Sequence, residues 1–135
     1  EQALVPAREL ARTLGVPLVL LQVIDLMHPA FIAGPYGGAD YMRILAILDE
    51  GAERYLAEVA ARERQHGLTV ETAKVTGVPA TAIAHYGTSH PGSLLVLGTH
   101  GRSGWRAAIL GSVARRVLLL ADGPVLLVRA QPPAS

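Results

Sequence analysis

Short apolar runs alternate along this chain with segments of helical periodicity. Residues Pro17–Ile24 are almost continuously apolar, and Leu94–Leu97 and Val125–Val128 are two further runs of this kind. A strand that is apolar on both faces is typical of a parallel sheet covered by helices on both sides, because a solvated face would bring in alternating polar residues. Residues 69–75 alternate less cleanly, and we interpret them as an edge strand.

Four segments with a 3.6-residue apolar period separate or precede these runs. We expect helices over residues 2–14, 41–66, 79–90 and 112–121. Gly15 and Gly67 are expected to end the first two. In the long second helix the predicted inward stripe consists of Ile44, Leu48, Ala52, Tyr55 and Val59. Regular alternation of helix and strand predicts an α/β fold with a doubly wound, Rossmann-like parallel sheet and helices on both faces.

The length suits one domain, which we place at residues 1–130, with a tail at 131–135. A doubly wound sheet normally starts with a strand near its centre. This sequence begins inside a helix with no strand before it. We therefore expect a first, central strand upstream of Glu1; a structure in which another segment takes the central position would contradict this.

Composition narrows the classes of partner. Half of the residues are apolar and 17% are charged, which argues against disorder over most of the chain. A net charge of +1 gives no electrostatic case for nucleic acid. No apolar run approaches the roughly 20 residues that cross a bilayer, and no basic segment followed by an apolar one marks a signal peptide. Cysteine is absent. We expect a cytoplasmic protein without a membrane or nucleic-acid partner.

The apolar run Leu94–Leu97 is followed by glycines at 98, 101, 104 and 111, and Ser112 then opens a helix. This order places a strand end, a glycine loop and a helix N-terminus together. Amides at a helix start lack intrahelical partners and carry partial positive charge, so they favour phosphate, and glycines let a ligand approach the backbone. The alternative for the glycines is structural, because they also permit a tight turn. Ser112 is expected to be an N-cap, and this is compatible with phosphate binding because a hydroxyl at a helix start can also donate to a phosphate.

The loop lacks the lysine of a P-loop, and the dinucleotide pattern G-x-G-x-x-G and the elbow G-x-S-x-G are absent. Its spacing, Gly98-x2-Gly101-x9-Gly111-Ser112, resembles the ATP-binding pattern of the universal stress protein family. Gly123–Val128 resembles the end of that family's sequence, Leu20–Asp25 its second strand, and Gly77–Ala80 the turn after its third strand.

The resemblance implies a role for each matching position. Gly98 would lie against the ribose, and Gly101, Gly111 and Ser112 would receive the phosphates with the Val113 amide beside them. Val23 would contact the adenine. The family's base-binding aspartate follows its first strand, so no residue of this sequence is its equivalent, and Asp25 is not a substitute for it.

Arg102 offers a charge-assisted contact to phosphate, with a solvated loop arginine as the alternative. The histidines show no metal-ligand spacing, and residues 98–113 hold no carboxylate for catalysis. We therefore expect an ATP-binding regulatory protein of the stress response, without catalytic or metal-ligating residues, whose Mg²⁺ is held by phosphate and water. The alternatives are a slow ATPase or phosphotransferase and a nucleotide-free interaction module. The family pairs its last strand across a two-fold axis, which implies a homodimer through Val125–Val128.

Overall fold

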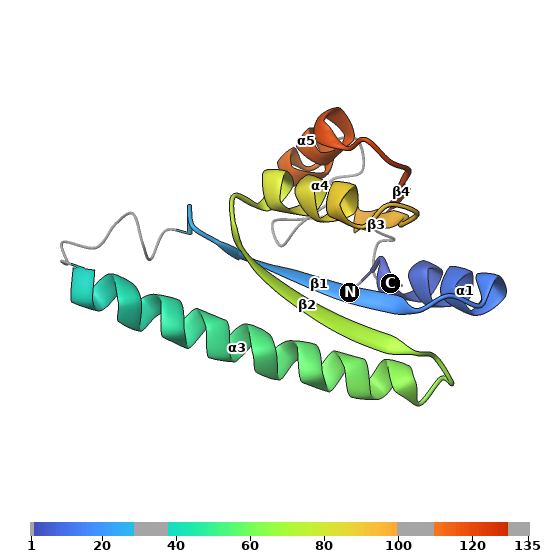
Figure 1. Cartoon of the computed structure of the whole chain (residues 1–135), viewed down its shortest axis with the longest axis horizontal. Helices are drawn as coiled ribbons and strands as arrows, with labels where there is room; N and C mark the ends of the chain where they lie inside the picture. The colour runs from blue at the N-terminus through green and yellow to red at the C-terminus, as the bar shows by residue number, and fades with distance from the viewer. Residues whose placement is uncertain (1, 29–37, 100–109, 130–135) are drawn as a thin grey trace, which may run out of the picture. The chain divides into compact units, whose positions relative to one another are not determined.

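The computed structural model describes residues 2–28, 38–99 and 110–129 (Figure 1). Helices and strands alternate along it in the predicted order. They are α1 (Leu4–Leu14), β1 (Leu18–Asp25), α3 (Gly38–Arg64), β2 (Val70–Gly77), α4 (Pro79–Ser89), β3 (Leu95–Gly98), α5 (Ser112–Leu120) and β4 (Val125–Val128). Every predicted helix and strand is present, with ends displaced by up to three residues. None of the described helices is long and apolar enough to span a membrane.

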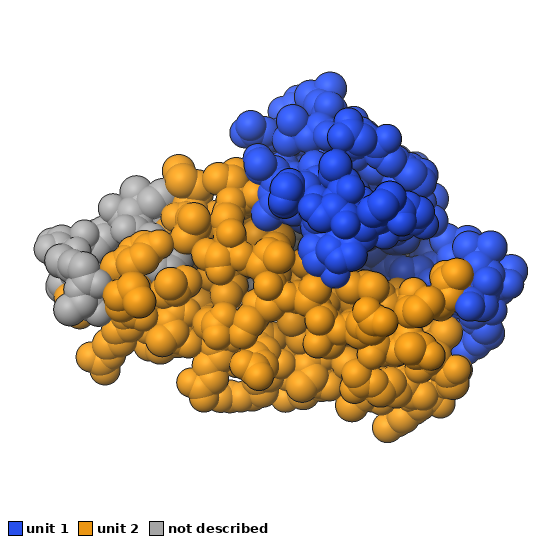
Figure 2. Space-filling model, in the orientation of Figure 1, with its two compact units in different colours: residues 1–15, 80–135 blue, residues 16–79 orange. Residues whose placement is uncertain are grey.

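The strands pair in parallel, as the apolar runs predicted. The chain divides into two compact units, residues 16–79 and residues 1–15 with 80–135 (Figure 2). In the first, β1 pairs with β2 from Leu18↔Val70 onward, and β2 has no second partner among the described strands. In the second, β3 pairs with β4.

Within the described ranges no strand pairs with both two-stranded sheets, so the upstream central strand stays a prediction. The single domain over 1–130 also stays a prediction, and the tail at 131–135 lies outside the described residues.

The residues of α3 that pack on β1 and β2 differ in part from the predicted inward stripe. Ala52 and Val59 are buried as expected, but Tyr55 is 44% exposed, and Leu56 and Ala60 take the inward positions. Adjacent residues lie about 100° apart around a helix, so only one of Tyr55 and Leu56 can face the sheet. The helix places the aliphatic side chain inward and the phenol outward.

The helix α3 is longer than the strands it covers. Its 27 residues span about 40 Å, whereas the eight residues of β1 span about 26 Å. Its fully buried positions all lie from Ala52 onward, and Met42 near its start is 61% exposed. Figure 1 shows the first turns of α3 extending past the ends of β1 and β2.

Lys74 of β2 forms ion pairs with two acidic residues in the middle of α3. The Lys74 ammonium lies 2.8 Å from the Asp49 carboxylate and 3.5 Å from that of Glu53. The hydrogen bond to Asp49, together with the charges of Asp49 and Glu53, raises the pKa of Lys74 above its ordinary value of 10.5. The two carboxylates lie four residues apart on one helix face, so one ammonium reaches both and fixes the helix against the strand.

In the other unit, α4 approaches β3 closely at a glycine. A Cβ on Gly87 would lie 3.0 Å from Leu95 Cδ1, which is closer than side chains normally pack. Ala80 and Ala84 of α4 and Ala114 and Val117 of α5 are buried in the same unit. Small residues thus allow short helices to cover four-residue strands.

Candidate functional site

Thr99, the residue directly after β3, makes two backbone hydrogen bonds, one to the end of β4 and one to the start of α5. The Thr99 N–H donates to the Val128 carbonyl at 2.9 Å, and the Thr99 carbonyl accepts the Gly111 N–H at 2.7 Å. Although residues 100–110 intervene in the chain, the N-terminus of α5 therefore lies beside the carboxyl end of β3. This is the juxtaposition of strand end and helix start that the sequence predicted.

The first three amides of α5 have no hydrogen-bond acceptor within the helix. Gly111 is the N-cap, and the first helical bond runs from the Arg115 N–H to the Gly111 carbonyl at 3.0 Å. Helix geometry therefore leaves the amides of Ser112, Val113 and Ala114 without acceptors in the helix. Ser112 and Val113 are exposed. The expectation that Ser112 is an N-cap is wrong: Ser112 is the first helical residue, and no side chain caps α5. Its hydroxyl is not used as a cap.

The two described glycines of the motif do not need glycine for their backbone angles. Gly98 is the last residue of β3 and pairs with Val128, and Gly111 has φ −58° and ψ 152°, an extended conformation open to any residue. By contrast, Gly15 ends α1 at φ 65°, in the left-handed region, as predicted. Gly98 and Gly111 lack a Cβ, so a ligand can approach their backbone closely. This favours the ligand-binding interpretation of the two glycines over the tight-turn alternative.

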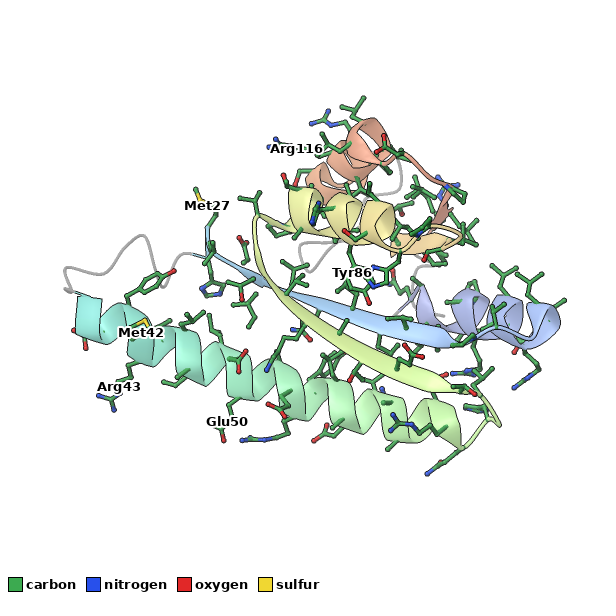
Figure 3. All side chains as sticks on the ribbon, viewed as in Figure 1. Met27, Met42, Arg43, Glu50, Tyr86 and Arg116 are labelled. Carbon is green, nitrogen blue, oxygen red and sulfur yellow. The ribbon has the colours of Figure 1, made fainter. Side chains whose placement is uncertain are left out.

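The electrostatics at this helix start favour an anion. The first turn of α5 holds no acidic residue, and no carboxylate occurs from Leu110 to Ala121. Asp122 follows the opposite end of the helix, where it accepts a hydrogen bond from the Thr88 hydroxyl at 3.3 Å. The partial positive charge at the start of α5 is thus not neutralised by its own residues. Arg115 and Arg116 add exposed positive charge (Arg116 is labelled in Figure 3).

The structure brings together four of the seven predicted site residues: Gly98, Gly111, Ser112 and Val113. Val23 lies in β1, half-buried and paired with Val75, in the unit formed by residues 16–79. Gly101 and Arg102 lie outside the described residues. The described part of the predicted site therefore consists of the end of β3 and the start of α5.

Sequence reasoning missed Thr99. Its role is carried by its amide and carbonyl, which every residue has, so only its position directly after a strand and before a glycine loop could have drawn attention to it.

Asp25 takes part in a turn directly after β1. Its carboxylate accepts the Met27 N–H at 2.8 Å, closing the carboxyl end of β1. Met27 itself is exposed beyond that strand (Figure 3).

His90 has a local structural role at the end of α4. His90 follows α4, its Nδ1 lies 2.8 Å from the Tyr86 carbonyl, and its ring stacks on the Tyr86 ring with centroids 4.0 Å apart (Tyr86 is labelled in Figure 3). A histidine that donates to a carbonyl of the last turn caps a helix C-terminus. Within the described ranges, no three histidine or acidic side chains gather as metal ligands.

Comparison with known proteins points to one family. The model of the universal stress protein family matches residues 1–129. One relative, Universal stress protein MJ0531 of Methanocaldococcus jannaschii, is 30% identical over 123 residues, which are 91% of this chain and 71% of that protein.

Two solved structures share the fold. UspA from Lactobacillus plantarum has a TM-score of 0.72 at 25% identity, covering 94% of this chain and 87% of that one. Hypothetical protein MJ0577 has a TM-score of 0.78 at 20% identity, covering 97% and 90%, and this likeness concerns the fold alone. With the family model matched over residues 1–129, and with the strand end and helix start of its motif side by side, the chain belongs to the universal stress protein family.

Proposed function

We propose that this chain binds ATP and acts as a regulatory protein of the stress response, with nucleotide occupancy as its signal. The observation that carries the proposal is the 2.7 Å hydrogen bond from Gly111 to Thr99, which holds the exposed amides of Ser112 and Val113 at the carboxyl end of β3. In α/β folds, this end of the sheet is where ligands bind, and a helix N-terminus there favours phosphate. The family's glycine spacing assigns the phosphate to a nucleotide.

The residues at the start of α5 fit a phosphate group. Neither Gly98 nor Gly111 carries a Cβ, no carboxylate competes for the amides, and the Ser112 hydroxyl is not used as a cap. Gly101 and Arg102 extend the proposed contacts to the phosphates, and Val23 supplies the proposed contact to the adenine. Mg²⁺ would be held by phosphate and water, because the described site offers it no carboxylate.

The residues at the start of α5 suit ATP binding better than ATP hydrolysis or phosphoryl transfer. Phosphoryl transfer requires a group that orients water or accepts a proton beside the γ-phosphate. The described residues at the start of α5 are glycine, serine, valine and alanine, and none of them can act as such a base at neutral pH. Turnover at ordinary kinase rates, about 1–100 per second, would contradict this part of the proposal.

The test is to identify what the protein retains. Protein purified without added nucleotide is denatured, and the supernatant is separated by ion-exchange chromatography. We expect an adenine nucleotide at a fixed ratio to protein, or, if purification strips it, saturable binding of ATP in calorimetry. Protein that neither retains nor takes up ATP would instead be the nucleotide-free interaction module.

We also propose a homodimer through β4. In the described sheet, β4 pairs only with β3, and its four apolar residues are half-buried. An apolar strand with an unpaired edge is normally covered, and a second β4 would complete its ladder. Sedimentation that showed only a 14.2 kDa species at micromolar concentration would count against it.

A further inference from the structure

Five residues of α3 form one line on the helix face away from β1 and β2, and four of them are exposed while the first, Asp40, is half-buried. This line, the α3 seam, consists of Asp40, Arg43, Ile47, Glu50 and Arg54. Their spacing of three, four, three and four residues is that of a coiled-coil contact. The seam lies opposite the buried residues Ala52 and Leu56, and Figure 3 shows Arg43 and Glu50 pointing away from the strands.

The charges of the α3 seam are antisymmetric about Ile47. Seven residues before Ile47 the seam carries an acid, Asp40, and seven residues after it a base, Arg54. Four residues before it stands a base, Arg43, and three residues after it an acid, Glu50. If the same helix is laid antiparallel across this one with a two-fold axis at Ile47, every acid meets a base. The face is therefore complementary to itself.

The centre of the α3 seam is apolar and open. The Ile47 side chain is 61% exposed, although isoleucine is among the residues most often buried. About one helical turn after Ile47, Gly51 has no atom within 4 Å of the position that a Cβ would occupy. In the antiparallel arrangement Ile47 meets its own copy at the axis. The aliphatic stem of Arg43 then crosses above Gly51 of the second copy, where no side chain obstructs it.

The charged ends of the seam can bind across the axis and still keep their present contacts. The Arg54 guanidinium lies 3.3 Å from Glu50 within the same helix, with side chains 69% and 76% exposed. Because a guanidinium has five N–H donors in a fork, it can keep Glu50 and also donate to Asp40 of a second copy. Likewise, Glu50 retains lone pairs for Arg43 of that copy.

We propose that the α3 seam binds the same face of a second copy of this chain, antiparallel, with a two-fold axis at Ile47. A partner of uniform charge would repel half of the seam, and an apolar partner would bury its four charges unpaired. A copy with the same antisymmetric pattern pairs them all, which is how an isologous interface works. The interface is separate from β4 and does not depend on nucleotide binding. With both interfaces in use, dimers associate into larger assemblies.

Cysteine cross-linking tests the axis directly, because the chain has no cysteine of its own. In Ile47→Cys the two thiols meet at the axis and form a disulfide under mild oxidation. The control is Ala61→Cys, an exposed position on the same helix face. In the proposed pair the two residues at 61 lie about 42 Å apart along the helices, far beyond disulfide reach. Equal rates of cross-linking for the two variants would overturn the proposal.

Charge exchange tests the register. We expect Arg43→Glu alone and Glu50→Arg alone each to weaken α3 association about tenfold, because each places like charges opposite one another at two symmetric sites. The double variant R43E/E50R associates more tightly than either single variant, because the swapped charges meet again across the axis. Sedimentation velocity over a concentration series measures these constants, and circular dichroism verifies the fold of each variant. Single variants that associate like wild type, or a double variant as weak as the singles, would refute the pairing.

Discussion

We expect Gly111→Val to lower the proposed affinity for ATP by about 100-fold, equivalent to about 2.7 kcal/mol of binding free energy. At φ −58° and ψ 152° the backbone of Gly111 suits valine, so the fold and the hydrogen bond to Thr99 persist. The new methyl groups stand at the N-cap of α5, beside the amides of Ser112 and Val113. They keep a phosphate out of hydrogen-bonding distance, and each lost charge-assisted bond costs about 1.5–3 kcal/mol. Isothermal titration calorimetry with ATP and Mg²⁺ measures the change.

The matched control is Gly123→Val in the same unit. Gly123 also lacks a positive φ, and the nearest atom to its added Cβ is the Ser93 carbonyl oxygen at 4.0 Å. It follows α5 at the opposite end from the proposed phosphate contacts. We expect its ATP affinity to match that of the unsubstituted protein. Equal affinities of the Gly111 and Gly123 variants would remove the phosphate cradle from the start of α5.

Replacing Val117 with aspartate unfolds the unit that contains α5, or lowers its free energy of unfolding by about 4 kcal/mol or more. Val117 has no exposed surface, so the carboxylate would be desolvated inside an apolar contact. Urea denaturation followed by circular dichroism measures the effect as a fall in the transition midpoint at unchanged slope.

The control is Leu119→Asp, two residues further along the same helix. Leu119 is 80% exposed, and aspartate there changes stability by about 0.5 kcal/mol or less. The two substitutions introduce the same charge at nearly the same distance from the start of α5. A difference in stability between the two variants therefore results from the burial of Val117 and not from the change in net charge. Similar midpoints for the two variants would show that α5 does not pack through Val117.

The helices and strands could be predicted from the sequence because their signals are local. Leu18–Asp25 and Val125–Val128 are apolar on both faces, and Gly15 stands where a helix must turn left-handed. The inward face of α3 could not be assigned in the same way. Tyr55 and Leu56 are both apolar enough to pack, and the choice between them depends on where β1 and β2 lie.

The candidate site, too, could be predicted from the sequence only in part. The spacing of Gly98, Gly111 and Ser112 predicted a strand end beside a helix start, because each element has its own periodicity and the glycines mark the junction. The sequence could not show that Thr99 makes the connection, since its backbone groups have no side-chain signature. Nor could it separate an N-cap from a first helical residue at Ser112, positions that differ by one residue.

The two hydrogen bonds of Thr99 have a thermodynamic consequence. One reaches Val128 at the end of β4, and the other reaches Gly111 at the start of α5. The proposed nucleotide cradle and the proposed dimer strand are thus both hydrogen-bonded to one residue, through the two peptide groups on either side of its Cα. Linkage between two such equilibria is reciprocal. Whatever factor ATP applies to the dissociation constant of the β4 dimer, dimerisation applies the same factor to the dissociation constant of ATP.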